Sequence, residues 1–335
     1  NTKLYTGTEP SNKAVTGVGF QPDFTWIKQR SGAEGHYLAD VLRGSTKVLR
    51  SNENAVENDR GSNGIQSFDS DGFTAGGGDD INSNGGTFAS WNWKAGTTSG
   101  ITTTGSTITP TAYSFNQTAG FSIIKYNGNS GGSGYNALIP HGLGVAPKLI
   151  IVKQLDYGTE HWGVYHASLG NTKTIYLNKT DDEYGATNMW YDTSPTTVNF
   201  SVGTNDIVNN TNANYIAYCF AEKTGYSKFG SYTGNGNDDG TFVYTGFAPA
   251  FVLQKNYTSG SANDWTLADN KRPGYNVIND RLCPNTTAST ATNNKVDFLS
   301  NGFKCRQDQS NANASGQTYI YMAFAEAPLV GSNNV

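Results

Sequence analysis

The 335-residue chain has little cysteine, little charge and no long apolar run, and each shortage excludes a class of protein. Charged residues make up 15% of the chain and the formal net charge is −4, so no basic surface is expected for nucleic acid or an anionic membrane. No stretch approaches the roughly 18 consecutive apolar residues of a membrane-spanning helix. We therefore expect neither nucleic-acid binding nor membrane insertion.

The three cysteines, Cys219, Cys283 and Cys305, are too few for a disulfide framework. Cys283 and Cys305 lie in the same third of the chain and could pair. Incidental packing is the better explanation, because neither has a counterpart in the other copies of the repeat described below. No set of Cys and His residues has the spacing of metal ligands.

Motifs of catalysis are also missing. No Ser, His and Asp residues accompany a nucleophile-elbow signature, and no Gly-rich loop follows a strand and opens a helix. The sequence therefore predicts a protein that is not an enzyme, with no catalytic residue, no cofactor-binding residue and no metal-binding residue.

The residues that are abundant indicate an all-β fold. Forty Gly and 19 Tyr accompany frequent Thr, Ser and Asn, a composition typical of short strands joined by tight turns. The segment Thr318–Phe324 is apolar almost throughout, which suits a strand buried on both faces. Helical turns are expected only around Leu38–Arg43. Many short antiparallel strands favour a sandwich or jelly roll.

One pattern occurs three times along the chain. It begins with an aromatic-Xaa-Gly turn, continues with a strand that follows a proline, and closes with an aromatic strand. From that proline to the last aromatic residue the intervals are 71, 73 and 75 residues. The turns are Tyr5-Thr6-Gly7, Tyr126-Asn127-Gly128 and Tyr232-Thr233-Gly234; the intervals run from Pro22 to Trp93, Pro147 to Phe220 and Pro249 to Phe324. Three near-equal spacings predict triplication of one unit.

We accordingly predict three tandem β-sandwich (jelly-roll-like) repeats of about 100 residues, and an arrangement about a pseudo-threefold axis is a further expectation. The predicted boundaries are 1–96 for repeat 1, 119–224 for repeat 2 and 225–328 for repeat 3. Residues 97–118, rich in Thr, Ser and Gly, are predicted to be an extended linker, and residues 329–335 a loose tail.

Asp69-Ser70-Asp71-Gly72 resembles the start of a calcium loop. Position five of that loop would be Phe73, which cannot ligate a cation. The third copy has Leu299-Ser300-Asn301-Gly302 at the same place. We therefore expect a tight turn between two strands, in which Asp-Gly or Asn-Gly supplies the residues of positive φ.

Two further groups of carboxylates, Asp238-Asp239 and Asp181-Asp182-Glu183, could bind a cation or act as acid and base. Each group occurs in one copy only, inside a segment of variable length. A solvated loop is the favoured interpretation, and Ca²⁺ binding is the alternative.

One polar position is repeated: Asp40, His166 and Asp269 fall at the same place in the three copies. Each lies four residues after a ring-bearing residue, His36, Trp162 and Trp265 in turn. Such a residue could line a sugar-binding groove beside that ring. The favoured interpretation is a strand-end residue that holds a loop in place.

Aromatic residues in copy-specific, turn-rich segments are the best candidates for surface contacts, because Tyr and Trp supply contact area together with a polar group. The candidate surface-binding residues are Tyr157, Tyr184, Trp190, Tyr191, Tyr257 and Tyr275. The alternative is that these rings cover the core edges of their own domain.

Several segments resemble the repeats of virion proteins from tailed phages, particularly phages of marine bacteria. The resemblance lies in Gly19–Lys28, Phe68–Phe73, Ala89–Gly96, Gly142–Pro147, Tyr215–Glu222 and Gly225–Gly230. It implies a structural or adhesive protein at the particle surface, such as a tail fibre, tail tip or capsid appendage. It implies no catalytic or binding residues.

The expected function is that of a tail-fibre or tail-tip adhesin whose variable loops contact the host surface. Expected partners are other virion proteins and a host-surface glycan or protein, and homo-oligomerisation is a further option. The first alternative is capsid decoration with a purely structural role. The second is an envelope-polysaccharide depolymerase, which would need paired carboxylates in a groove, with Asp181, Asp182 or Glu183 beside Trp190.

Overall fold

The computed structural model describes residues 1–130, 136–260, 262–292 and 296–326, and in them the chain is all-β with several antiparallel sheets. The predicted all-β class is therefore confirmed. For description we divide the chain into an N-terminal part (1–96), a middle part (97–224) and a C-terminal part (225–326). The predicted tail, residues 329–335, lies outside the described residues.

The N-terminal part holds nine strands, one short α-helix and one 3-10 helix. Their bounds are β1 Thr2–Thr6, β2 Lys13–Thr16, β3 Phe24–Gln29, β4 Tyr37–Asp40, β5 Lys47–Val48, β6 Asn58–Asp59, η1 Gly61–Asn63, β7 Ile65–Asp69, β8 Gly72–Ala75, α1 Asp79–Asn82 and β9 Thr87–Trp93.

The middle part is the longest and has nine strands and two single-turn helices among its described residues. Their bounds are β10 Ala112–Asn116, β11 Phe121–Asn127, β12 Ala137–Pro140, β13 Leu149–Gln154, β14 Gly163–His166, β15 Lys173–Tyr176, β16 Tyr184–Gly185, α2 Thr187–Trp190, β17 Asn199–Val202, α3 Asp206–Asn209 and β18 Asn214–Phe220.

The C-terminal part has seven strands among its described residues. Their bounds are β19 Ser227–Thr233, β20 Phe242–Tyr244, β21 Pro249–Asn256, β22 Thr266–Asp269, β23 Val296–Leu299, β24 Gly302–Cys305 and β25 Thr318–Ala325.

Each part contributes one large antiparallel sheet, and the strands follow the same order in all three. The orders are β1-β9-β3-β4, β11-β18-β13-β14 and β19-β25-β21-β22; in the middle part β10 is added at one edge and β15 and β16 at the other. Smaller sheets, β2-β8-β7, β12-β17 and β20-β24-β23, accompany the large ones. In each part the predicted aromatic closing strand is therefore central, between β1, β11 or β19 on one side and the strand of the proline segment, β3, β13 or β21, on the other.

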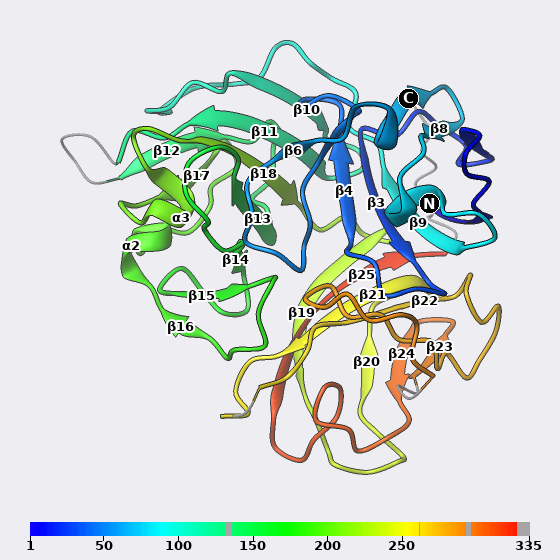
Figure 1. The fold of residues 1–335 in the computed structure, drawn as a ribbon. Coiled ribbons are helices and arrows are strands. Elements are labelled where there is room, and N and C mark those ends of the chain that lie inside the picture. Colours follow the sequence, from blue (N-terminus) through cyan, green and yellow to red (C-terminus); the bar gives the residue numbers. More distant parts are fainter. Residues whose placement is uncertain (131–135, 261, 293–295, 327–335) are drawn as a thin grey trace.

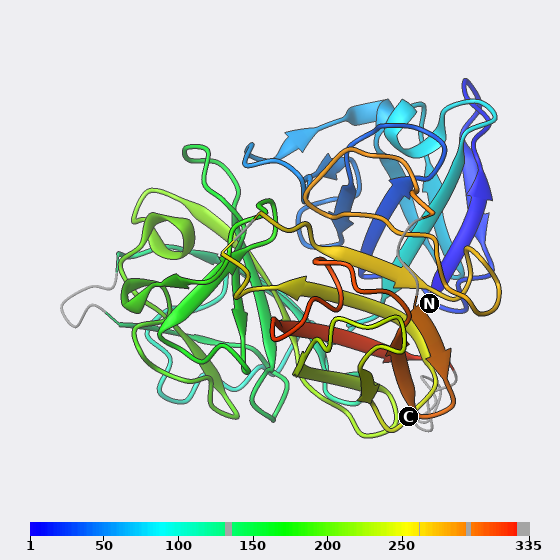
Figure 2. The same cartoon turned by 90° about the horizontal axis from the view of Figure 1, so that it is seen from below.

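The three large sheets surround one common core (Figures 1 and 2). Side chains alternate along each strand, so Trp26 packs into the common core while its neighbour Ile27 packs into a local core against the smaller sheet. The middle and C-terminal parts have local cores of their own. Both faces of the closing strands are thus buried, which explains why β18 and β25 are apolar almost throughout; β9 also has the buried polar residues Ser90 and Asn92.

One ring-bearing residue of each part hydrogen-bonds to a carbonyl of another part, and we call these three contacts the ring bridges. Trp162 Nε1 donates to the Arg50 carbonyl at 3.0 Å, and Trp265 Nε1 donates to the Tyr176 carbonyl at 3.0 Å. His36 completes the set, with Nε2 3.1 Å from the Cys283 carbonyl. All three rings are buried. Every part is therefore bound to both of the others.

The tautomer of His36 follows from a second contact of its ring. Trp26 Nε1 donates to His36 Nδ1 at 2.8 Å, so Nδ1 accepts and the proton of the neutral ring lies on Nε2. Burial lowers the pKa of His36 well below its usual value, which keeps the ring neutral. His36 can therefore donate to the Cys283 carbonyl as the two indoles donate to theirs.

Of two local predictions, one is confirmed and the other is wrong. The tight turn at Asp69–Gly72 is confirmed, because β7 and β8 form a hairpin there, as β23 and β24 do around Ser300-Asn301. Of the Asp-Gly and Asn-Gly residues expected to have positive φ, only Gly72 does, at 149°. The prediction of helical turns at Leu38–Arg43 was wrong. That segment begins as strand β4, since Leu38 and Ala39 pair with β3 and are buried on opposite faces.

The segment predicted to be an extended linker, residues 97–118, is attached to the middle part. Its last residues form strand β10, which pairs with β11. Thr107 and Ile108 bond through their N–H groups to the Leu138 carbonyl, and Ile108 is buried in the local core. These contacts close the outer edge of β12.

Candidate recognition surface

The repeated polar residues, Asp40, His166 and Asp269, lie at the ends of β4, β14 and β22 and are fully buried. They therefore line no surface groove. Asp40 Oδ1 accepts the N–H groups of Leu42 and Arg43 at 3.0 Å, and Asp269 Oδ1 accepts the equivalent pair, Lys271 and Arg272. His166 Nδ1 accepts the N–H of Ser168 at 3.1 Å. Each thus fixes the chain that follows its strand.

The same three residues also bind a closing strand of another part, and we call these contacts the strand-end bridges. Tyr218 donates its hydroxyl to Asp40 at 2.7 Å, and Trp91 Nε1 donates to Asp269 at 3.2 Å. His166 Nε2 lies 3.2 Å from the Tyr321 carbonyl. The strand-end bridges run around the molecule in the opposite sense to the ring bridges.

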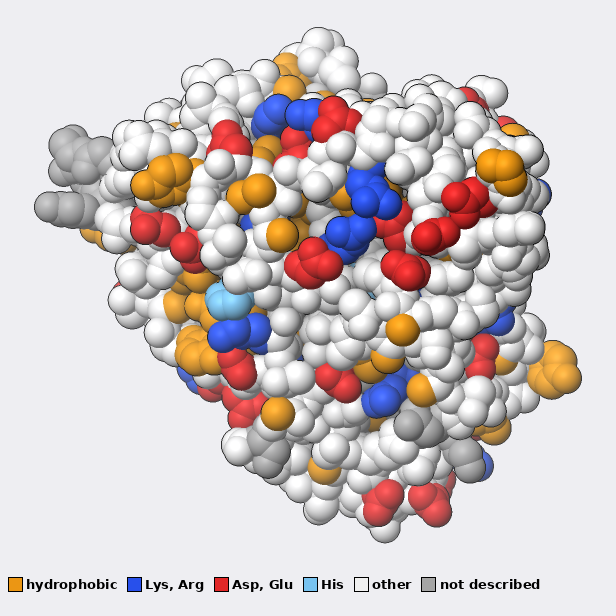
Figure 3. Space-filling view, in the orientation of Figure 1, with side chains coloured by type: hydrophobic (Ala, Val, Ile, Leu, Met, Phe, Trp, Pro, Cys, Tyr) orange, Lys and Arg blue, Asp and Glu red, His pale blue; other side chains and the backbone are white. Residues whose placement is uncertain are grey.

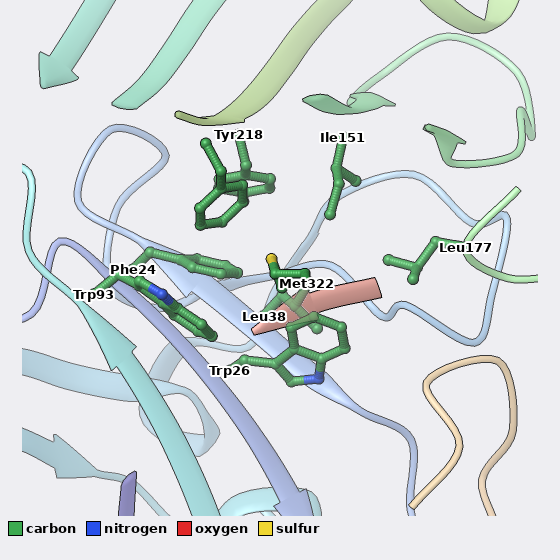
Figure 4. A pocket seen from close by; sticks show the side chains of 9 residues that line it. Phe24, Trp26, Leu38, Trp93, Ile151, Leu177, Tyr218 and Met322 are labelled. Atoms are coloured by element: carbon green, nitrogen blue, oxygen red, sulfur yellow. The ribbon is translucent and has the colours of Figure 1, made fainter. Parts of the chain in front are cut away.

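A small cavity lies in the common core, where Phe24, Trp26 and Trp93 of the N-terminal part meet Tyr218 and Met322 of the other two parts (Figure 4). Its volume is about 10 Å³, and side chains from all three parts point toward it. That is the space of roughly one water molecule, and an apolar lining does not retain water. The cavity is a packing defect and is too small for a ligand.

The cysteines and the carboxylate groups are accounted for by local contacts. Cys219, Cys283 and Cys305 are free thiols, buried, and burial raises the pKa of each to about 12. Asp71 accepts the N–H groups of Gly17 and Gly19 at 2.8 and 2.6 Å. Exposed Asp239 pairs with Lys304. In the described ranges, no three His, Cys, Asp or Glu side chains come together as a metal site would require.

The six aromatic candidates have different positions. Tyr157, Tyr184, Tyr191 and Tyr275 are exposed, by 49%, 38%, 39% and 81%. Tyr257 is half-buried against the common core. Trp190 was expected at the surface and is instead 1% exposed: it lies on α2 and packs against Tyr165 in the local core, with ring centroids 5.7 Å apart. It therefore cannot be a surface contact.

Tyr184 forms a row of rings with two residues that the sequence did not single out, and we call His161, Tyr176 and Tyr184 the aromatic row. The Tyr176 centroid lies 5.3 Å from both other rings, with interplanar angles of 38° to His161 and 39° to Tyr184. Tyr176 ends β15 and Tyr184 begins β16, the strands found only in the middle sheet. In Figure 3 this face shows histidine, hydrophobic, lysine and acidic side chains side by side.

Charged side chains border the aromatic row. Lys179 Nζ lies 5.7 Å from the Tyr176 ring centroid and 3.2 Å from Asp181 Oδ2, and Tyr184 donates its hydroxyl to Asp181. The hydrogen bond from Tyr184 lowers the pKa of Asp181. Burial, then Asp181, raises the pKa of Tyr184 to about 12. At neutral pH the row therefore presents neutral rings beside a lysine–carboxylate pair.

The loop that follows the aromatic row is held by the C-terminal part. Lys255 Nζ donates to the Thr180 carbonyl at 2.9 Å, and Asp182 accepts the hydroxyl of Ser259 at 3.2 Å. Burial lowers the pKa of Lys255 to about 8. The row therefore stands on a surface fixed by two parts of the molecule.

The sequence could not indicate the aromatic row, because its members are 15 and 8 residues apart and meet only through strand pairing. Tyr184 was a candidate on its own, whereas His161 and Tyr176 stood in segments that resembled ordinary strands. Among the described residues, none of the other five candidates has a ring contact with the row.

Comparison with known families gives one match. The family described as "Domain of unknown function (DUF7483)" covers residues 1–328. No curated protein and no solved structure matches the chain. In the described residues, no helix is both long enough and apolar enough to cross a membrane.

Proposed function

The chain belongs to the DUF7483 family, and from this starting point we propose that it is a non-enzymatic component of a tailed-phage particle that contacts the host surface through exposed loops. The phage assignment rests on the sequence resemblance described above. The recognition role rests on one structural observation, the separation between buried repeated residues and exposed unrepeated rings.

That separation is visible residue by residue. The repeated positions, such as Asp40, His166 and Asp269, are buried and join the three parts. The exposed rings of Tyr157 and Tyr184 have no counterpart in the other parts. A fixed scaffold with unlike loops suits recognition, because loops can change without disturbing the core.

We further propose that the three parts are copies of one β-sandwich unit of about 100 residues around a pseudo-threefold axis. The common order of strands supports this. So do equivalent details: Tyr5, Tyr126 and Tyr232 each donate a hydroxyl to a carbonyl near the end of the part, at 2.6–2.7 Å. So do the two sets of bridges, because each set links the three parts cyclically, the ring bridges in one sense and the strand-end bridges in the other.

Capsid decoration is the second candidate, and β20 favours it. This strand lies at the edge of its sheet, and its Phe242 and Tyr244 are 44% and 64% exposed. The equivalent edge of β12 is closed by Thr107 and Ile108. An open edge with exposed aromatic residues suits docking to another protein.

The depolymerase alternative has less support. Asp181 pairs with Lys179, Asp182 accepts from Ser259, and Glu183 pairs with Lys173. Trp190 is buried. Incubation with host envelope polysaccharide should leave the polymer length unchanged in size-exclusion chromatography, and shortened chains would revive this alternative.

The decisive experiment locates the chain on the particle. Gold-labelled antibodies against the purified protein should mark the tail end, and purified protein should reduce phage adsorption to host cells by competition. Labelling over the capsid without competition would support decoration instead. Particles that carry no label would contradict both proposals.

A further inference from the structure

We propose that the aromatic row binds an uncharged sugar, with Tyr184 and Tyr176 as the apolar platform and His161 Nε2–H as the hydrogen-bond donor. The inference rests on the proposed recognition function and specifies the ligand class and the residues for it. Three observations support it: the orientation of His161, the solvent-facing polar atoms of His161 and Tyr176, and the charges around the rings.

The proton of His161 is placed by a chain of two hydrogen bonds. The N–H of Trp162 donates to Asn178 Oδ1 at 3.2 Å, which identifies the oxygen of that amide. Asn178 Nδ2 lies 2.8 Å from His161 Nδ1 and therefore donates to it. Burial, then Lys179, lowers the pKa of His161, so the ring is neutral with its proton on Nε2.

The donor and one hydroxyl of the row are free to meet a ligand. Among the described residues, neither His161 Nε2 nor the Tyr176 hydroxyl has a protein partner, and neither is among the buried atoms that lack one. Both therefore face solvent. A sugar needs apolar area for its ring face and polar groups for its hydroxyls, and tyrosine supplies both.

Charge decides which sugars fit. Around the aromatic row lie two lysines, Lys173 and Lys179, and four carboxylates: Glu160, Asp181, Asp182 and Glu183. Both lysines are already paired with acids. Buried Lys153 and Lys255, whose pKa burial lowers to about 8, bring the lysines to four, which equals the number of carboxylates. The surface therefore has no excess of positive charge that would attract an acidic or sulfated polymer, whereas an uncharged sugar meets no penalty.

The test is affinity electrophoresis of the full chain in native gels. The uncharged probes are dextran, laminarin and mannan, and the acidic probes are dextran sulfate and alginate. The first two variants are Tyr184→Ala, which removes the exposed ring, and His161→Phe, which keeps a ring against Tyr176 but lacks the donor. Tyr275→Ala is the matched control, because Tyr275 is an exposed tyrosine in another part. Circular dichroism confirms that each variant is folded.

We expect retardation by at least one uncharged polymer, little change between 50 and 500 mM salt, and a fivefold or greater loss of affinity in both row variants. Tyr275→Ala should bind normally. The inference would be overturned if only acidic polymers retarded the protein or if no uncharged polymer did. It would also be overturned if the two row variants were retarded as strongly as the unmodified protein.

The two proposals fail in different ways. If Tyr184→Ala competes for phage adsorption as well as the unmodified protein does, the aromatic row is not the ligand site and the recognition function stands. If the unmodified protein does not compete and is absent from the particle, the recognition function itself fails.

Discussion

Removing the carboxylate of Asp269 should destabilise the whole molecule, because it leaves a buried arginine without its partner. Asp269 and Arg272 are both fully buried, with Arg272 Nε 2.6 Å from Asp269 Oδ2. Trp91 of the N-terminal part donates to the same oxygen. Breaking a buried pair on one side costs about 3–5 kcal/mol, so Asp269→Ala should lower the free energy of unfolding by about that amount.

Equilibrium unfolding in urea measures the loss. With an m value of about 3 kcal/mol/M, the midpoint should fall by about 1–1.7 M. Fluorescence of Trp91 and its neighbours and far-ultraviolet circular dichroism should give one coincident transition, because the three parts share a core. Asp239→Ala is the control: Asp239 forms an exposed pair with Lys304 and should change stability by no more than about 0.5 kcal/mol.

The middle part suggests a compensating pair of changes. At the places of Asp269 and Arg272 it has His166 and Leu169, both buried. Asp269→His combined with Arg272→Leu should therefore recover most of the loss, since the unpaired charge is gone. The reasoning would be refuted if Asp269→Ala matched the control, or if the C-terminal part unfolded in a separate step.

Three further predictions concern other contacts. Gly128→Ala should lower stability by more than 1 kcal/mol in urea titration, because an added Cβ would lie 2.1 Å from the Asn210 carbonyl; equal stability would contradict the close approach. His166 has a pKa of about 4 in the fold against about 6.5 unfolded, so about 3 kcal/mol should be lost as pH falls from 6.5 to 4, and His166→Gln should show a shallower decline. Burial lowers the pKa of Lys153 to about 8, as it does for Lys28 and Lys255. These values lie below the unfolded value of about 10.5, so stability should rise between pH 8 and 10. Lys153→Met should make that rise smaller, and Lys28 and Lys255 account for what remains.

The strands could be predicted because their signals are local. The proline before Phe24 and the aromatic run ending at Trp93 mark β3 and β9, and the apolar character of Thr318–Ala325 indicated burial on both faces. The side chains that cover the second face of each closing strand come from strands that are distant in the sequence. No local pattern could indicate that the common core joins Trp93 to Phe220 and Phe324, with ring centroids 6.1 and 5.8 Å apart.

The candidate site was less predictable than the fold. Trp190 and Tyr191 are adjacent in sequence, yet one is buried and the other exposed, because α2 turns the first toward the local core and ends before the second. Asp40 and Asp269 could be identified as equivalent, but their partners Tyr218 and Trp91 lie 178 residues away. Repetition thus indicated which positions matter for structure without indicating what they contact.

The closed arrangement of the three parts limits where residues can be inserted. A linear array of repeats can gain or lose members, and its two end faces need polar caps. Here His36 of the first part bonds to the third and Asp269 of the third binds the first, so neither part is terminal. A fourth part could not be inserted without breaking both sets of bridges. Between the bridges, residues can therefore be inserted without breaking a contact only in the peripheral loops.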